Sequence, residues 1–146
     1  MRVTESRNFE KYVNLAYEAD PELIRKWHVV SGKGLSHCVD RTVADLKMLK
    51  TLTFYVVHKG NQFVGYFGSE FGGAYMPTIF ILPKFRFQKA EFWSVIEKHL
   101  LNPFSAGVFA KNKRCVKFYE RMGQEVGRVY TPDGEGVIFS FNKRSH

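Results

Sequence analysis

The amino-acid sequence predicts one α/β (α+β) domain, spanning residues 1–146, in which helices cover both faces of a mixed, mostly antiparallel sheet. Three observations lead to this fold class. A chain of 146 residues is long enough for one core but short for two. A hydrophobic content of 45%, with 14 Phe and 7 Tyr, indicates an aromatic-rich core rather than a disordered chain. The hydrophobic periodicity also changes repeatedly between that of helices and that of strands.

The first 50 residues are predicted to be mainly helical. We expect a short strand at residues 2–4 and helices at residues 9–17, 21–29 and 43–49. Residues 31–37 (SGKGLSH) contain two glycines, which predicts a loop that can lie over a pocket.

The middle of the chain is predicted to form three strands and a long helix. Residues 53–57 and 63–67 are separated by a Gly60-Asn61 turn, which indicates a hairpin. A third strand is expected at residues 75–82, closing at Pro83. Residues 85–101 carry Phe92, Ile96 and Leu100 at intervals of four, which is typical of one apolar helix face.

The C-terminal part alternates strand, helix and strands. Residues 106–110 form an apolar run typical of a buried strand. Residues 113–122 predict a helix with Cys115, Phe118, Tyr119 and Met122 on one face and Gly123 as its C-cap. Residues 124–130 and 136–141 then predict two final strands.

The net charge of +8 favours an anionic cofactor or a polyanionic partner without distinguishing them. A basic cluster in and before the predicted 113–122 helix fits a solvated face, contacts to cofactor phosphates, or nucleic-acid binding; its members are Lys111, Lys113, Arg114, Lys117 and Arg121. The spacing 113, 117, 121 predicts a stripe on one helix face.

The two cysteines, Cys38 and Cys115, show no spacing typical of a zinc site or a disulfide framework. We expect no metal and reduced thiols, as in a cytoplasmic protein. No stretch is apolar enough for a membrane span or a signal peptide, so no membrane partner is expected.

The segment from Asn112 to Gly123, NKRCVKFYERMG, carries the most specific pattern. It has an Asn where a strand meets a helix and a Tyr-Glu pair one turn before a glycine, and it follows the apolar strands that end at Leu82 and Ala110. This region resembles the C-terminal half of the GNAT family, the acetyl-CoA-dependent N-acetyltransferases. The resemblance extends over residues 51–141, whereas the first 50 residues fit it only loosely.

The resemblance implies that the protein moves an acetyl group from acetyl-CoA, as co-substrate, to an amine on a small molecule or a peptide. In the family, a strand corresponding to residues 75–82 diverges from the next one, and its main-chain groups bind the pantetheine arm. Ile79 and Ile81 would supply those groups here.

The resemblance also places a pyrophosphate cradle at the start of the following helix. Arg86 matches the first position of the family pattern, but Lys89 and Glu91 stand where the family has small residues. Lys89 can compensate by meeting a phosphate, whereas Glu91 would bring a negative charge close to one. The implied cradle comprises Arg86, Phe87, Gln88, Lys89 and Ala90.

Three further residues receive roles from the resemblance. Tyr119 matches the family's tyrosine general acid, and Asn112 matches an asparagine that contacts the cofactor. Glu70, at the end of a predicted strand, is the best-placed carboxylate for a general base. Each also has a purely structural reading, as a packed tyrosine, a helix N-cap and an exposed strand-end carboxylate.

Two other functions stay open. Lys89 and Glu91 fit a GNAT-like binding or assembly protein of the phage virion type that has lost its cradle and its activity. The charge, together with aromatic residues between basic ones at Lys84-Phe85-Arg86-Phe87, fits a nucleic-acid binder. The sequence does not determine the oligomeric state.

Overall fold

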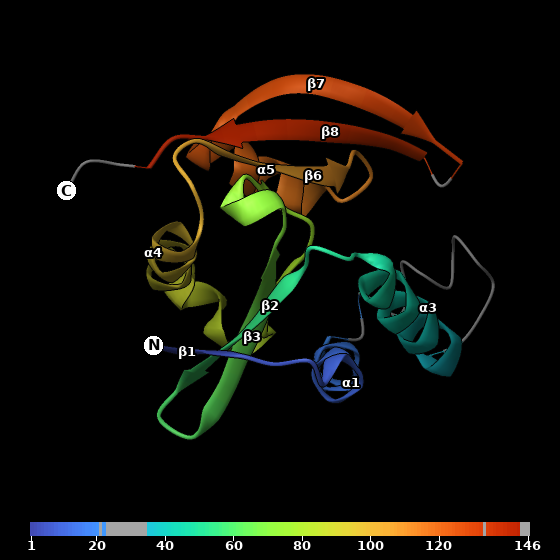
Figure 1. Ribbon diagram of the computed structural model, residues 1–146, viewed down its shortest axis with the longest axis vertical. Coiled ribbons are helices and arrows are strands. Elements are labelled where there is room, and N and C mark those ends of the chain that lie inside the picture. The colour runs from blue at the N-terminus through green and yellow to red at the C-terminus, as the bar shows by residue number, and fades with distance from the viewer. Residues whose placement is uncertain (21, 23–34, 133, 144–146) are drawn as a thin grey trace.

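The computed structural model describes residues 1–20, 22, 35–132 and 134–143. The expected fold class is confirmed, because helices flank two mostly antiparallel sheets (Figure 1). Apart from Glu22, which is helical, the predicted helix at 21–29 lies outside the described residues.

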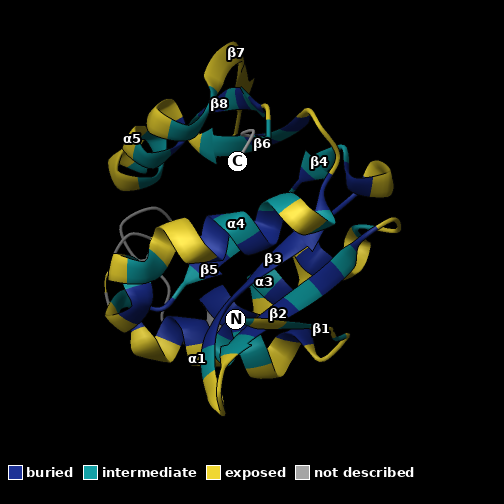
Figure 2. Ribbon diagram, turned by 90° about the vertical axis from the view of Figure 1, so that its left-hand side faces the viewer, coloured by how far each residue is buried: buried dark blue, intermediate teal, exposed yellow. Residues whose placement is uncertain are grey.

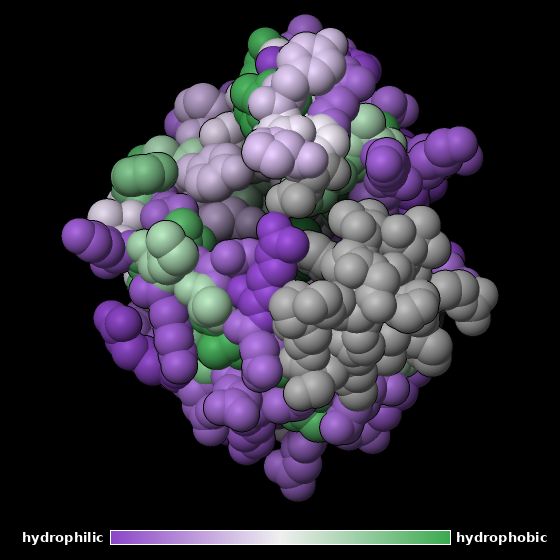
Figure 3. Space-filling view, turned by 90° about the vertical axis from the view of Figure 1, so that its right-hand side faces the viewer, coloured by the Kyte–Doolittle hydropathy of each residue, from purple (hydrophilic) through white to green (hydrophobic). Residues whose placement is uncertain are grey.

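The N-terminal sheet has four antiparallel strands in the order β1-β2-β3-β5. Their bounds are Arg2–Glu5, Thr53–Lys59, Gln62–Ser69 and Ile79–Ile81. Helices α1 (Phe9–Ala19) and α3 (Leu35–Met48) lie on one side of this sheet and α4 (Lys89–His99) on the other (Figure 1). Figure 3 shows one face of the molecule, and the described residues on this face are largely hydrophilic.

The C-terminal sheet has the order β4-β6-β8-β7. Its strands are Tyr75–Met76, Phe104–Phe109, Gly134–Phe141 and Gln124–Thr131, and β4 runs parallel to β6 while the other pairs are antiparallel. Helix α5 (Lys113–Met122) packs on this sheet through Tyr119, whose ring lies 5.1 Å from that of Phe141. Strand β7 is exposed along its whole length (Figure 2).

The predicted strand at 75–82 is two strands in two different sheets. Tyr75 and Met76 pair with Ser105 and Ala106 in the C-terminal sheet, whereas residues 79–81 pair with residues 65–67 in the N-terminal sheet. Between them Pro77 has no amide proton to donate to a ladder, which suits the point where the chain changes sheets. The two sheets therefore diverge from this point.

Two predicted helix bounds differ from the structure. Helix α3 begins at Leu35, inside the stretch expected to be a loop. The predicted 85–101 helix is a 3-10 helix, η2 (Pro83–Gln88), followed by α4, which ends at His99. Pro83 is suited to a first helical turn, so the helical segment starts earlier than the apolar pattern indicates.

Helix α4 joins the two sheets into one core. Phe92 packs against Phe67 of β3 with ring centroids 6.3 Å apart. One residue later, Trp93 packs against Phe104 of β6 at 5.7 Å and Phe141 of β8 at 5.0 Å. All five rings are at least nine-tenths buried, so aromatic contacts dominate the region between the sheets.

Replacing Gly123 by Ala is expected to reduce the free energy of unfolding by about 1–3 kcal/mol. Gly123 is the C-cap that the sequence predicted: its backbone is extended, and its N–H donates to the Tyr119 carbonyl. Glycine is required because an added Cβ would collide with the Phe141 ring and the Ser140 carbonyl oxygen. Urea unfolding measures the loss, with Gly127→Ala as the control because nothing lies within 4 Å of its added Cβ. Equal stability of the two variants would contradict this explanation.

Candidate functional site

A cleft of about 300 Å³ opens between β5 of the N-terminal sheet and α5 of the C-terminal sheet. One part of its lining is apolar or aromatic, and the other contains five basic side chains and two carboxylates. The apolar part consists of Ile79, Phe80, Ile81, Phe92, Cys115, Phe118 and Tyr119. The polar and charged part consists of Asp20, Glu22, Arg86, Lys89, Asn112, Arg114, Lys117 and Arg121.

The main chain of β5 presents hydrogen-bonding groups to this cleft. The Thr78 carbonyl accepts from Gly68 N–H at 3.0 Å, and Leu82 N–H donates to the Val64 carbonyl at 2.8 Å. Because bonded residues alternate in an antiparallel ladder, Phe80 also bonds to β3, whereas the main-chain groups of Ile79 and Ile81 point away from it. Strand β5 is at the edge of its sheet, so these groups are open to an added strand or an extended ligand.

The residues of the implied cradle are dispersed by η2 and α4. Arg86 and Lys89 line the cleft. Phe87 is 80% exposed, Ala90 is exposed, and Gln88 accepts a hydrogen bond from Lys59 Nζ at 3.2 Å; none of these three lines the cleft. Lys89 N–H donates to the Arg86 carbonyl, because a 3-10 helix bonds its amides to carbonyls three residues back. That amide is therefore not a bare donor for a phosphate.

Glu91 does not line the cleft. Its carboxylate pairs with Lys59 Nζ at 3.2 Å and with the N-terminal amine of Met1 at 3.4 Å. The hydrogen bond from Lys59 is the main cause that lowers the pKa of Glu91. The expectation that Glu91 would bring negative charge to a bound phosphate is therefore wrong.

Arg86 is held by an ion pair within the cleft. Its guanidinium lies 2.6 Å from the carboxylate of Asp20, which is 4% exposed. Asp20 also accepts from Glu22 N–H at 3.2 Å, as expected of a helix cap. Much of the Arg86 charge is thus neutralised locally, and Lys89 and the α5 cations bring further positive charge to the cleft.

The positive charge on α5 faces the cleft along a different stripe from the one predicted. Arg114, Lys117 and Arg121 line the cleft, whereas Lys113 does not. Positions separated by three and four residues share a helix face, so both stripes fit the sequence. At the start of the helix, the Asn112 side chain accepts from Cys115 N–H at 3.3 Å, so Asn112 is an N-cap that also borders the cleft.

Tyr119 lines the cleft but is only 1% exposed. Burial is the first cause that raises its pKa well above the usual value, and the charge of Cys115 and a hydrogen bond to the Cys115 side chain add to it. The phenol therefore stays protonated at neutral pH. This makes it a hydrogen-bond donor and a weak acid.

Glu70 does not line the same cleft as Tyr119. It is 7% exposed, so the expectation of an exposed strand-end carboxylate is wrong, and its Oε2 accepts from Thr51 Oγ1 at 2.9 Å. Tyr75 interacts electrostatically with both residues. Burial and then the charge of Glu70 raise the pKa of Tyr75. The charge of Tyr75 is in turn a minor cause of the raised pKa of Tyr119. Nothing in the sequence marks Tyr75 as part of a site, because its spacing carries no catalytic pattern.

We expect the free energy of unfolding to fall with pH above about pH 10 because of two buried tyrosines. Burial is the largest cause that raises the pKa of both Tyr66 and Tyr119 in the folded chain. Unfolded tyrosine ionises near pH 10, so both groups stabilise the fold fully below that pH, and the contribution is lost as the pH rises. Urea unfolding at increasing pH should give a shallower decline for Tyr66→Phe than for the unchanged protein. Parallel declines would contradict the assignment.

Among the described residues, no three His, Cys, Asp or Glu side chains gather as a metal site would require. Within the same residues, no helix is long and apolar enough to cross a membrane.

The sequence matches no protein-family model and no curated protein. Comparison with solved structures finds clear similarity. A spermidine N-acetyltransferase SpeG variant from Vibrio cholerae matches with a TM-score of 0.62 and 10% identity, covering 97% of this chain and 95% of that one. An acetyltransferase from Thermus thermophilus matches with a TM-score of 0.62 and 13% identity over 98% of both chains. AAC(6')-Ib in complex with acetyl-CoA matches with a TM-score of 0.62 and 15% identity, over 98% of this chain and 94% of that one.

These similarities extend over nearly the whole chain, including the first 50 residues that fit the family pattern only loosely. At such low identity they establish the fold and not the residues of the site. The resemblance found in the sequence is confirmed at that level: this chain has the fold of the GNAT acetyltransferases.

Proposed function

We propose that the protein is an N-acetyltransferase that moves an acetyl group from acetyl-CoA to an amine. The observation that supports this most directly is the cleft between β5 and α5, where the open main-chain edge at Ile79 and Ile81 lies beside a cationic rim. Coenzyme A combines an extended amide-containing arm with phosphates, and the two parts of the cleft match these two chemistries. A solved structure of the same fold, AAC(6')-Ib, holds acetyl-CoA.

The phosphates would be held mainly by side chains. Lys89 is in the cleft, while the amide of the same residue is occupied by the Arg86 carbonyl. Arg114, Lys117 and Arg121 add three cations from α5. In this chain, cationic side chains therefore substitute for the small-residue cradle that the sequence lacks.

Two residues would handle protons in the transfer. Acetyl-CoA supplies an activated thioester. Glu70 would accept the proton that the attacking amine loses, directly or through a water. Tyr119 would donate a hydrogen bond to the departing sulfur. A thiol ionises near pH 8.5, below the raised pKa of Tyr119, so hydrogen-bond stabilisation contributes more than complete proton transfer.

A second function is favoured by one observation. The bonded Lys89 amide and the Arg86–Asp20 ion pair reduce the number of groups free to hold phosphates. A protein with this fold that binds a partner without catalysing transfer would need none of them. Binding of acetyl-CoA distinguishes the two proposals.

The test is a thermal-unfolding titration with acetyl-CoA, followed by an assay of thiol release in the presence of amines. At about 100 times its dissociation constant, acetyl-CoA should add about 2.7 kcal/mol to the free energy of unfolding. For a chain of this size this corresponds to a rise of roughly 5–10 °C in Tm. ATP serves as the polyanion control and should shift Tm less. No shift at millimolar acetyl-CoA, or an equal shift with ATP, would eliminate the acetyltransferase.

A further inference from the structure

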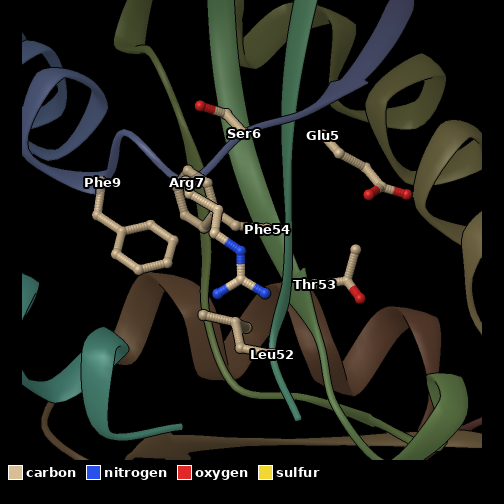
Figure 4. Close-up of a pocket in the computed structure, with 7 residues that line it drawn as sticks. All are labelled: Glu5, Ser6, Arg7, Phe9, Leu52, Thr53 and Phe54. Carbon is tan, nitrogen blue, oxygen red and sulfur yellow. The ribbon is translucent and has the colours of Figure 1, made fainter. Parts of the chain in front are cut away.

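A second cavity of about 220 Å³ lies where the chain leaves β1 and enters β2. Its floor is apolar: Phe9, Leu52 and Phe54 are each at least nine-tenths buried. Its rim carries the side chains of Glu5, Ser6, Arg7 and Thr53 (Figure 4). The cavity thus combines an apolar base with polar and charged groups, as binding sites for small organic molecules do.

Arg7 brings a positive charge to this cavity. Its guanidinium points into the space above Leu52 and beside Thr53 (Figure 4). The nearby carboxylate of Glu5 lies on the other side of β2 from Arg7 in that view. Glu5 pairs in register with Tyr55, and its charge is the second cause, after burial, that raises the pKa of Tyr55. The side chain of Glu5 is therefore directed toward Tyr55 rather than toward Arg7.

The carboxylate proposed as the base, Glu70, does not line this cavity but lies close to residues that do. Leu52 and Thr53 line the cavity, and the preceding residue, Thr51, donates to the Glu70 carboxylate at 2.9 Å. Thr53 also pairs with Ser69, the residue before Glu70. Arg7 follows β1 and Glu70 follows β3 at the same end of one sheet, so two strand spacings, about 10 Å, separate their main chains.

We propose that this cavity binds the anionic end of the acceptor, so that the substrate is an amine that also carries a carboxylate and an apolar group. Arg7 binds the carboxylate, because a guanidinium offers paired donors to its two oxygens. Phe9, Leu52 and Phe54 contact the apolar group, and the amine reaches Glu70. A short peptide meets these requirements, since three extended residues span about 10 Å between amine and carboxylate. This inference rests on the proposed acetyltransferase function.

The test is calorimetric titration with a tripeptide that ends in an apolar residue, compared with the same peptide as its C-terminal amide. Removing the carboxylate charge should weaken binding about tenfold or more. An aminoalkyl phosphate of similar length shows whether any anionic group suffices. If this phosphate bound as tightly as the tripeptide acid or more tightly, the cavity would be a phosphate site, and the proposal of a carboxylate site would be overturned.

Two variants locate the effect. Arg7→Gln should abolish the preference for the acid over the amide, because it removes the charge from the cavity. Arg2→Gln, in the preceding strand β1 and outside the cavity, should retain the preference. Equal binding of acid and amide to the unchanged protein, or a preference that survives Arg7→Gln, would overturn the proposal.

The binding readout separates this inference from the proposed function. A tripeptide acid that binds through Arg7 and is acetylated supports both. An acid that binds through Arg7 without thiol release from acetyl-CoA supports the anionic site and contradicts the transfer reaction. Acetylation of amines that lack a carboxylate at rates equal to the tripeptide acid supports the transfer and contradicts the anionic site.

Discussion

Tyr119→Phe is expected to reduce the turnover of acetyl transfer by about 100-fold while leaving the affinity for CoA nearly unchanged. The reason is that the phenol hydroxyl is the only polar atom removed, and in the proposed reaction this hydroxyl donates a hydrogen bond to the departing sulfur. The ring remains packed against Phe141 at 5.1 Å and Phe139 at 5.6 Å, so the fold should be retained. Steady-state kinetics together with calorimetric titration of CoA measure the two quantities separately.

Tyr130→Phe is the matched control for this substitution. Tyr130 is 83% exposed on β7, so the same chemical change there should leave turnover unaltered. If Tyr119→Phe turned over as fast as Tyr130→Phe, Tyr119 would have no part in the reaction. If it lost CoA affinity as well as rate, its role would be in shaping the cleft.

The combined substitution Arg114→Glu and Lys117→Glu is expected to weaken CoA binding by roughly 30- to 1,000-fold. Each reversal replaces an attraction to a phosphate by a repulsion of similar size, about 1 kcal/mol each at ~4 Å in a water-like dielectric. Both side chains are exposed, so salt screens part of this effect, which is why the range is wide. The dissociation constant should also become less dependent on salt, because fewer charges contribute.

Lys113→Glu provides the control for the charge reversal. Lys113 is on the same helix and is also exposed, but it does not line the cleft. It should change CoA affinity several-fold less than either cleft-facing reversal. Similar losses from Lys113→Glu and Lys117→Glu would show that overall charge, rather than the cleft, attracts the cofactor.

Local patterns were sufficient to predict most of the elements. The alternation at residues 53–57 and 63–67 predicted β2 and β3, because side chains on a strand face opposite sides and one side here packs on α1. Helix α5 was predicted because its N-cap, apolar face and end are all encoded within residues 112–123. The division of residues 75–82 between two sheets was not predicted, since both halves have the same local preference and the division depends on partners distant in sequence.

The site was harder to predict because it depends on the direction of individual side chains. Lys89 and Glu91 both stand in the implied cradle, yet two residues on a helix differ by about 200° in direction, so only Lys89 faces the cleft. The ion pair between Asp20 and Arg86 bridges 66 positions of sequence. No local pattern indicates such a contact.

The central claim is that the open edge of β5 receives an extended ligand, and amide hydrogen exchange tests it most directly. With saturating CoA, the amides of Ile79 and Ile81 should exchange much more slowly, because they would donate to the ligand. The Phe80 amide faces β3 and should change little, which makes it an internal control. Exchange at Ile79 and Ile81 that is the same with and without CoA would contradict the account.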